Sequence, residues 1–197
     1  MKKNNKNRLM LIALLLFTTV AFTQTEIEGV EFANTIQIEN DKASLSGAGI
    51  RNEVFTNVYA IGLYHNESTT NAYKVIQSGK PMGVKIQVLS RFLPRTKYVT
   101  TLKEGFRNST LDNTKPIKTK IDHFFGLLDE NLGRGDVLKF LYHPDSGVKV
   151  YTNGELKGVV KGYKFKEALY GIWLSYPMVD RNLRGKMLGV DSQYVSN

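Results

Sequence analysis

Cysteine is absent from the 197-residue chain. A disulfide framework, a zinc–thiolate site, an iron–sulfur cluster and a cysteine nucleophile are therefore excluded. Histidine is almost as scarce, because only His65, His123 and His143 are present, and no two of them have the spacing of a metal-ligand motif. Phosphate-binding loops, dinucleotide fingerprints and nucleophile elbows are also missing. We therefore expect neither a metal nor a cofactor.

Positive charge is abundant, with 27 Lys and Arg residues against 18 Asp and Glu residues and a net charge of +9. Four of the basic residues precede the apolar run 9–17, which continues through Thr18 and Thr19 to Phe22. This arrangement is typical of a secretory signal peptide, and the run is short for a transmembrane helix of about 20 residues. We predict a leader over residues 1–23, cleaved after Ala21 or Thr23, with an uncleaved anchor as the alternative.

Without this leader the chain carries 23 basic and 18 acidic residues, a net charge of only +5. An exported protein also rarely meets nucleic acid, so we expect no nucleic-acid partner and contact with a membrane only through the leader. The predicted location is the periplasm or cell envelope. The remaining residues, 24–197, have the length of one domain and contain no internal repeat or low-complexity linker.

Alternating and helical patterns predict an α+β domain with a largely antiparallel sheet. Strands are expected over 43–50, 54–64, 84–88, 137–142, 148–152 and 156–160. Helices are expected over 71–78 (capped by Thr70), from Pro94 through Phe106, from 117 to a stop at Gly133, over 165–175, and over 180–188 (capped by Asp180). Strand 54–64 is apolar on both faces and should be central, whereas strand 84–88 should be half-exposed. The turn Asn153-Gly154 predicts a hairpin.

The clearest candidate for chemistry is Arg51, which ends the small-residue segment Gly47-Ala48-Gly49 next to strand 54–64. The fixed fork of a guanidinium suits a carboxylate, an enolate or a polarised carbonyl. Glycines would let a ligand approach the backbone closely. The alternative is an arginine in a surface turn, with the glycines forming a bulge.

Several segments together resemble the chalcone isomerase superfamily. The first are 47–51 (GAGIR) and 58–64 (VYAIGLY). Later ones, which resemble the chalcone isomerase-like branch common among exported bacterial proteins, are Gly135-Asp136-Val137, Tyr142-His143-Pro144, 153–158 (NGELKG) and 165–174 (FKEALYGIWL). The resemblance implies an open-faced β-sandwich, in which a layer of helices covers a large antiparallel sheet and a ligand cleft lies between them.

The resemblance also implies site residues. In the enzymes of this superfamily an Arg stabilises the enone oxygen, helped by a Thr, a Tyr, a Lys and an Asn, and in its fatty-acid binders an Arg and a Tyr hold the carboxylate. Here Arg51 matches the Arg and Tyr98 the Tyr. The Lys of the superfamily corresponds to Thr101 in this chain and its Asn to Gly105. The Thr on its first strand corresponds to Tyr59, and a later Thr lies near Ile172. The candidate ligand-binding residues are therefore Arg51, Tyr59, Tyr98, Thr101 and Ile172.

Three functions follow as hypotheses. The favoured one is non-catalytic binding of a fatty acid or a similar amphiphilic carboxylate, with Arg51 at the head group. The second is an intramolecular lyase or isomerase acting on a chalcone-like carbonyl compound, with Arg51 and Tyr98 as catalytic residues. Turnover also requires orientation of both rings, which can contribute about 7–11 kcal/mol, and the polar residues for this are missing. The third is a structural or interaction module in which Arg51 forms an ion pair. The partner is thus a small amphiphilic or aromatic ligand, and the oligomeric state stays open.

Overall fold

A computed structural model describes residues 24–53, 56–176 and 180–190. The leader predicted over residues 1–23 lies outside these ranges, as does the C-terminal end of the predicted domain at 191–197. The strands are β1 (Gln24–Ile27), β2 (Val30–Ala33), β3 (Thr35–Ile38), β4 (Asp41–Glu53), β5 (Thr56–His65), β6 (Met82–Val88), β7 (Phe92–Pro94), β8 (Asn131–Gly133), β9 (Val137–His143), β10 (Gly147–Thr152) and β11 (Glu155–Val160). The helices are α2 (Ala72–Ile76), α3 (Arg95–Ser109), the 3₁₀ turn η1 (Lys115–Ile117), α4 (Lys118–Gly126), α5 (Tyr163–Leu174) and α6 (Arg181–Met187).

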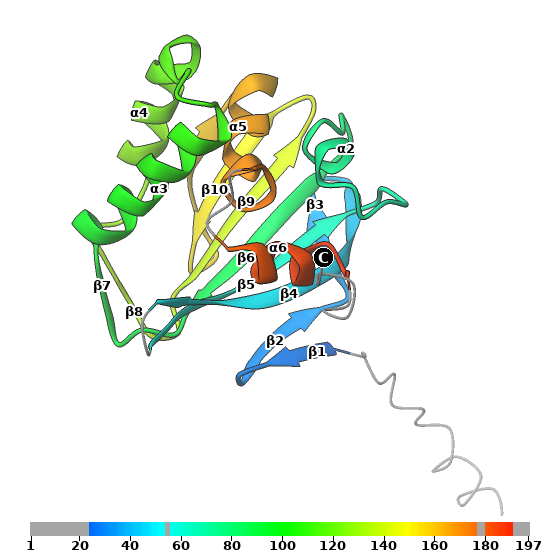
Figure 1. The fold of residues 1–197 in the computed structure, drawn as a ribbon, viewed down its shortest axis with the longest axis vertical. Coiled ribbons are helices and arrows are strands. Elements are labelled where there is room, and N and C mark those ends of the chain that lie inside the picture. Colours follow the sequence, from blue (N-terminus) through cyan, green and yellow to red (C-terminus); the bar gives the residue numbers. More distant parts are fainter. Residues whose placement is uncertain (1–23, 54–55, 177–179, 191–197) are drawn as a thin grey trace, which may run out of the picture.

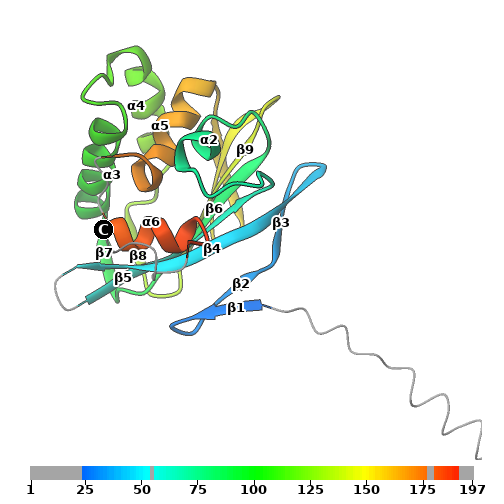
Figure 2. The same ribbon diagram turned by 45° about the vertical axis from the view of Figure 1, so that its right-hand side comes forward.

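Seven strands form the main sheet in the order β11-β10-β9-β6-β5-β4-β3, and every strand pair is antiparallel. The helices lie on one face of this sheet, and the β1–β2 hairpin lies against the other face (Figures 1 and 2). The predicted α+β class, with helices layered over a large antiparallel sheet, is confirmed. Within the described ranges, no helix is both long enough and apolar enough to cross a membrane.

Strand β5 is central and covered on both sides, as predicted. Ile61 and Leu63 belong to the large core beneath the helices, whereas Ala60 packs with Phe32 of the β1–β2 hairpin on the opposite face. The hairpin was not predicted, because each of its strands has only four residues. It also changes the environment of β6, where Lys85 lies over the Phe32 ring at 5.1 Å. Strand β6 is therefore more buried than expected.

Two predicted helix boundaries were wrong. The N-cap of α2 is Asn71 rather than Thr70, because the Asn71 side chain accepts the amide N–H of Lys74 at 3.1 Å. Helix α4 ends at Gly126 instead of continuing to Gly133. The segment Asn131–Gly133 becomes strand β8, because its backbone pairs with β7. The resulting β7–β8 ribbon lies at one end of the helix layer (Figure 1).

The core beneath α3, α4 and α5 contains a cluster of five phenylalanines, Phe106, Phe124, Phe125, Phe140 and Phe165. Neighbouring ring centroids lie 5.3–5.9 Å apart. Such aromatic pairs add about 0.5–1.5 kcal/mol each beyond the area that they bury. Phe124 and Phe125 of this cluster belong to α4, the helix predicted after Pro116. We call this cluster the phenylalanine core.

Candidate functional site

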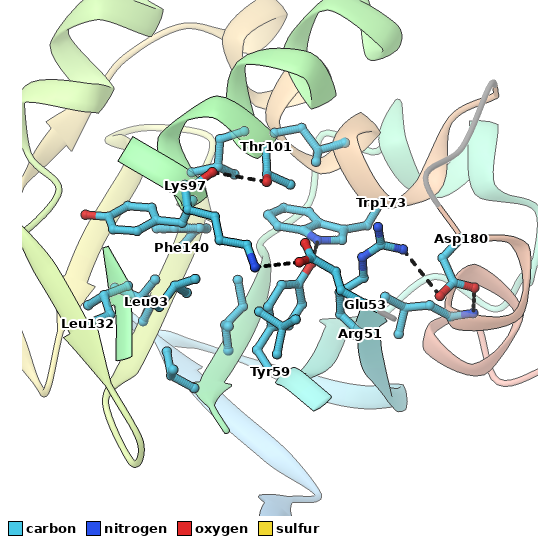
Figure 3. Close-up of a pocket in the computed structure, with 18 residues that line it drawn as sticks. Arg51, Glu53, Tyr59, Leu93, Lys97, Thr101, Leu132, Phe140, Trp173 and Asp180 are labelled. Atoms are coloured by element: carbon cyan, nitrogen blue, oxygen red, sulfur yellow. Dashed lines mark hydrogen bonds and ion pairs between the residues drawn. The ribbon is translucent and has the colours of Figure 1, made fainter. Parts of the chain in front are cut away.

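A pocket opens between the sheet and helices α3, α5 and α6 (Figure 3), and α4 contributes no residue to its lining. Its cavity volume is about 70 Å³. Most of its wall is apolar: Val58, Ile86, Val88, Leu93, Leu102, Leu132, Leu138, Phe140, Ile172 and Leu183. All five residues predicted to bind ligand, Arg51, Tyr59, Tyr98, Thr101 and Ile172, also line it. The structure thus brings the predicted residues together in one pocket.

Arg51 lies near the end of β4 at the mouth of the pocket, where its guanidinium faces Asp180 with Nη1 3.5 Å from Oδ2 (Figure 3). The two side chains are 17% and 25% exposed, so solvent screens this ion pair only in part. The other oxygen of Asp180 accepts the amide N–H of Leu183 at 3.0 Å. Asp180 is therefore the N-cap of α6, as predicted, and also the partner of Arg51.

The glycines next to Arg51 allow another part of the fold to pack closely on β4 and do not make room for a ligand. A Cβ atom at Gly47 would lie 2.0 Å from the Lys186 carbonyl oxygen, and one at Gly49 would lie 2.8 Å from the Leu183 side chain. Both neighbours belong to α6. The expectation that a ligand approaches the backbone at these glycines was therefore wrong, because α6 occupies that space. The bulge predicted by the alternative interpretation does occur, between Leu45 and Gly47.

Tyr59 is the cross-strand partner of Arg51, so both side chains lie on the same face of the sheet. Its hydroxyl oxygen accepts the indole N–H of Trp173 at 3.0 Å (Figure 3). Burial raises the pKa of Tyr59 above its ordinary value. The hydroxyl therefore stays protonated over the neutral range and can donate a hydrogen bond beside the guanidinium.

A second ion pair crosses the mouth. Lys97 of α3 lies 2.7 Å from the carboxylate of Glu53, at the end of β4 (Figure 3). Both residues line the pocket. Thr101, one turn further along α3, donates its hydroxyl to the Lys97 carbonyl at 3.2 Å. The mouth therefore carries two cations, each with a carboxylate partner.

Tyr98 contributes its ring to the wall, whereas its hydroxyl donates to the backbone carbonyl of Asp129. Arg95, one turn earlier, donates to the carbonyls of Phe125, Leu128 and Asp129. These bonds attach the start of α3 to the segment that follows α4. The Tyr98 hydroxyl is thus directed at this segment and does not accompany Arg51 at the mouth.

Ile172 lies where α5 crosses α3. A Cβ atom at Gly105 would lie 2.5 Å from Ile172 Cγ2. The residue at the position of the superfamily's Asn is thus a glycine that permits close helix packing. Trp173, Asp180 and Glu53 are among the residues that line the site without having been predicted. Asp180 was identified only as a helix cap, and the proximity of Trp173 to Tyr59 depends on a pairing 114 residues apart.

Within the described part of the chain, no three His, Asp or Glu side chains gather in a way that could hold a metal ion. His143 lies 3.1–3.7 Å from carboxylate oxygens of Glu39, Asp41 and Asp145. This cluster lies outside the pocket lining.

The architecture defines a class of protein in which helices cover one face of an antiparallel sheet and enclose an apolar pocket with charged groups at its mouth. A family model described as chalcone isomerase-like matches residues 24–189, and the chain belongs to this family. Among solved structures, a fatty-acid binding protein of Arabidopsis thaliana is similar, with a TM-score of 0.68 and 15% identity over 85% of this chain and 96% of that one. This likeness shows a shared fold. No curated protein sequence matches the chain.

Proposed function

We propose that this protein binds a fatty acid or a similar amphiphilic carboxylate without converting it, and that it does so after export to the periplasm or cell envelope. The observation that carries the proposal is the position of Arg51 at the mouth of an apolar pocket. A head group at Arg51 would leave the tail among leucine, valine and phenylalanine side chains. The fold shared with a fatty-acid binding protein supports the same function.

The head-group contact follows from the chemistry of the mouth. A guanidinium has five N–H donors and binds carboxylates in a bidentate manner. Asp180 contacts it through Oδ2 at 3.5 Å, so a ligand carboxylate can replace that contact while Asp180 still caps α6 through Oδ1. The Tyr59 hydroxyl lies on the same face and can donate to the same head group.

Turnover has less support than binding. Thr101 and Gly105 replace the superfamily's Lys and Asn, and the Tyr98 hydroxyl is bonded to a backbone carbonyl. A transition state with negative charge on a carbonyl oxygen would therefore meet Arg51 without the accompanying donors. The structural module is the stronger alternative, because Arg51 does form an ion pair with an internal carboxylate.

Calorimetric titration of the purified protein with octanoate tests the proposal. We expect saturable binding that Arg51→Ala weakens by roughly ten- to a hundredfold, because a hydrogen bond to a charged group contributes about 1.5–3 kcal/mol. Arg107→Ala is the matched control, since Arg107 is exposed on α3 and pairs with Asp112 outside the pocket. Absence of octanoate binding, or equal binding by Arg51→Ala, would contradict the proposal and favour the structural module.

Export is tested separately. The full chain is expressed in a bacterial host, the periplasmic fraction is isolated, and the mature N-terminus is sequenced. We expect the protein in that fraction with a first residue directly after Ala21 or Thr23. Recovery only in the cytoplasm with the leader intact would contradict the proposed location, and recovery in the membrane with the leader intact would indicate the anchor.

A further inference from the structure

The hydroxyl proton of Tyr59 has no acceptor among the described residues. The hydroxyl oxygen accepts the indole N–H of Trp173 at 3.0 Å, and this is the only hydrogen bond that Tyr59 forms through its side chain within the described ranges. Tyr98 and Tyr170, by contrast, both donate their hydroxyl protons to backbone carbonyls. Tyr59 therefore keeps a donor that a ligand can use.

The surroundings of this hydroxyl make an unused donor costly. Burial raises the pKa of Tyr59 more than any other influence does, and a polar group that has lost water without gaining a partner destabilises the protein. The carboxylates of Glu53 and Asp180 act on the hydroxyl electrostatically. They contact Lys97 at 2.7 Å and Arg51 at 3.5 Å instead of accepting its proton. A ligand oxygen at this point would satisfy a donor that the fold leaves unpaired.

Trp173 holds the Tyr59 hydroxyl in this state. The indole is only 6% exposed and stacks on Phe140, with ring centroids 6.4 Å apart and planes at 27°. Its single N–H can only donate, and it donates to the Tyr59 oxygen. Because that side of the oxygen receives a proton from the indole, the hydroxyl must direct its own proton away from Trp173.

Arg51 supplies a second donor close by. Arg51 and Tyr59 are cross-strand partners in β4 and β5, and the Cβ atoms of such partners lie about 4.5–5.5 Å apart. Both side chains line the pocket, and Figure 3 shows the guanidinium and the Tyr59–Trp173 pair next to each other. A carboxylate has two oxygens, so one head group can accept from the guanidinium and from the hydroxyl at the same time.

We infer that Tyr59 is the second head-group donor of the pocket and that Trp173 is the positioning residue that directs its proton to the ligand. The inference rests on the proposed function and specifies its ligand class, which is an anionic head group with at least two acceptor oxygens. Tyr98 cannot take this role, because its hydroxyl is bonded to the backbone.

The donor is tested with Tyr59→Phe, which removes only the hydroxyl. We expect octanoate, titrated calorimetrically, to bind roughly tenfold more weakly, because a hydrogen bond to a charged group is lost. Tyr170→Phe is the matched control: it removes the same atom from a fully buried tyrosine that does not line the pocket. Its octanoate affinity should stay within about twofold of the wild type. Wild-type affinity in Tyr59→Phe would overturn the inference.

The positioning role is tested with a double-mutant cycle. Trp173→Phe keeps an aromatic ring beside Phe140 and removes the N–H. We expect this substitution to weaken octanoate binding by roughly three- to tenfold in the wild-type background, and by less than about twofold in the Tyr59→Phe background. A residue that acts only as part of the wall would cause the same loss in both backgrounds, and that result would overturn the role assigned to Trp173.

A second replacement keeps the cycle informative if Trp173→Phe proves unfolded by circular dichroism. Trp173 is the only tryptophan of the chain, so biosynthetic replacement of tryptophan by β-(3-benzothienyl)alanine changes this position alone. The replacement puts sulfur in place of the N–H in a ring system of nearly the same shape. The same losses are expected in the two backgrounds, and equal losses would again overturn the positioning role.

The outcomes separate the two levels of proposal. If octanoate does not bind to the wild type, or binds equally to Arg51→Ala, the proposed function fails and the second donor fails with it. If octanoate binds through Arg51 but Tyr59→Phe binds it as well as the wild type does, only the assignment of Tyr59 and Trp173 fails. A loss in Tyr59→Phe, with coupling to Trp173 in the cycle, would support the assignment.

Discussion

The two ends of the space between the sheet and the helices differ in what fills them. At the α4 end, the five rings of the phenylalanine core pack edge to face or at a tilt. At the α6 end, leucine, valine and isoleucine side chains line a pocket together with Tyr59, Tyr98 and Trp173, and charged groups lie at its mouth. The same helices span both ends: α3 carries Phe106 in the core and Thr101 at the pocket, and α5 carries Phe165 and Ile172 in the same way.

The same backbone elements therefore form both ends, and the ends differ in the side chains that these elements present. We expect the packed rings at one end to contribute stability and the pocket at the other end to contribute binding. Phe140 belongs to both ends, since it contacts Phe124 in the core and Trp173 at the pocket. We therefore expect substitutions in the phenylalanine core to change mainly the free energy of unfolding, and substitutions at the pocket to change mainly the affinity for octanoate.

The largest effect is expected in the phenylalanine core. Phe124→Ala removes a fully buried ring with four phenylalanine neighbours, and we expect the free energy of unfolding to fall by about 3–5 kcal/mol. Urea denaturation measures this change. Phe92→Ala is the control, because Phe92 is 63% exposed and its removal should cost within about 0.5 kcal/mol. The free energy of octanoate binding should change less in Phe124→Ala than the free energy of unfolding. A larger change in binding would contradict the division between a stabilising end and a binding end.

A pH-dependent effect is expected at Lys166, next to Phe165. Its ammonium is fully buried, donates to the Ile76 and Ser78 carbonyls at 2.6 and 2.5 Å, and has its pKa lowered by burial to about 8. The unfolded chain holds this proton up to about pH 10.5, so the unfolded state binds more protons between pH 8 and 10.5. The free energy of unfolding should therefore rise with pH in this window, by at most about 3 kcal/mol.

Urea denaturation at pH 7.5, 8.5 and 9.5 checks this expectation for the wild type and Lys166→Met, and only the wild type should show the rise. The tyrosines act in the opposite direction at higher pH, since burial raises the pKa of Tyr64 to about 12 and that of Tyr170 further. Their contribution is lost above about pH 10, so the measurement stays below it. The same slope in Lys166→Met would show that another group is responsible.

The smallest effect is expected at the mouth of the pocket. Asp180→Asn removes the charge that faces Arg51 and keeps a side chain that caps α6 well. Octanoate affinity should increase by about two- to fivefold, in line with the value of a partly exposed ion pair. Asp112→Asn is the matched control, because Asp112 pairs with Arg107 away from the pocket. Weaker binding by Asp180→Asn would mean that Asp180 orients Arg51 for the ligand instead of competing with it.

Much of the fold could be predicted from the sequence, because long periodic segments such as 54–64 and the helix after Pro94 carry strong local signals. Short elements could not, since the three-residue strands β7 and β8 exist only through their pairing with each other. For the site, the resemblance led to five residues that do share one pocket. It did not reveal where the Tyr98 hydroxyl points, because that depends on the backbone of a segment 31 residues away.

Gly47 and Gly49 of β4 also influence the charged groups at the mouth of the pocket. Their missing side chains let α6 rest directly on β4, and the first turn of α6 is where Asp180 meets Arg51. A methyl group at position 47 would displace the helix and, with it, the Asp180 carboxylate that faces the guanidinium. The electrostatic state of the pocket mouth is thus determined in part by two residues that carry no charge and do not line the pocket.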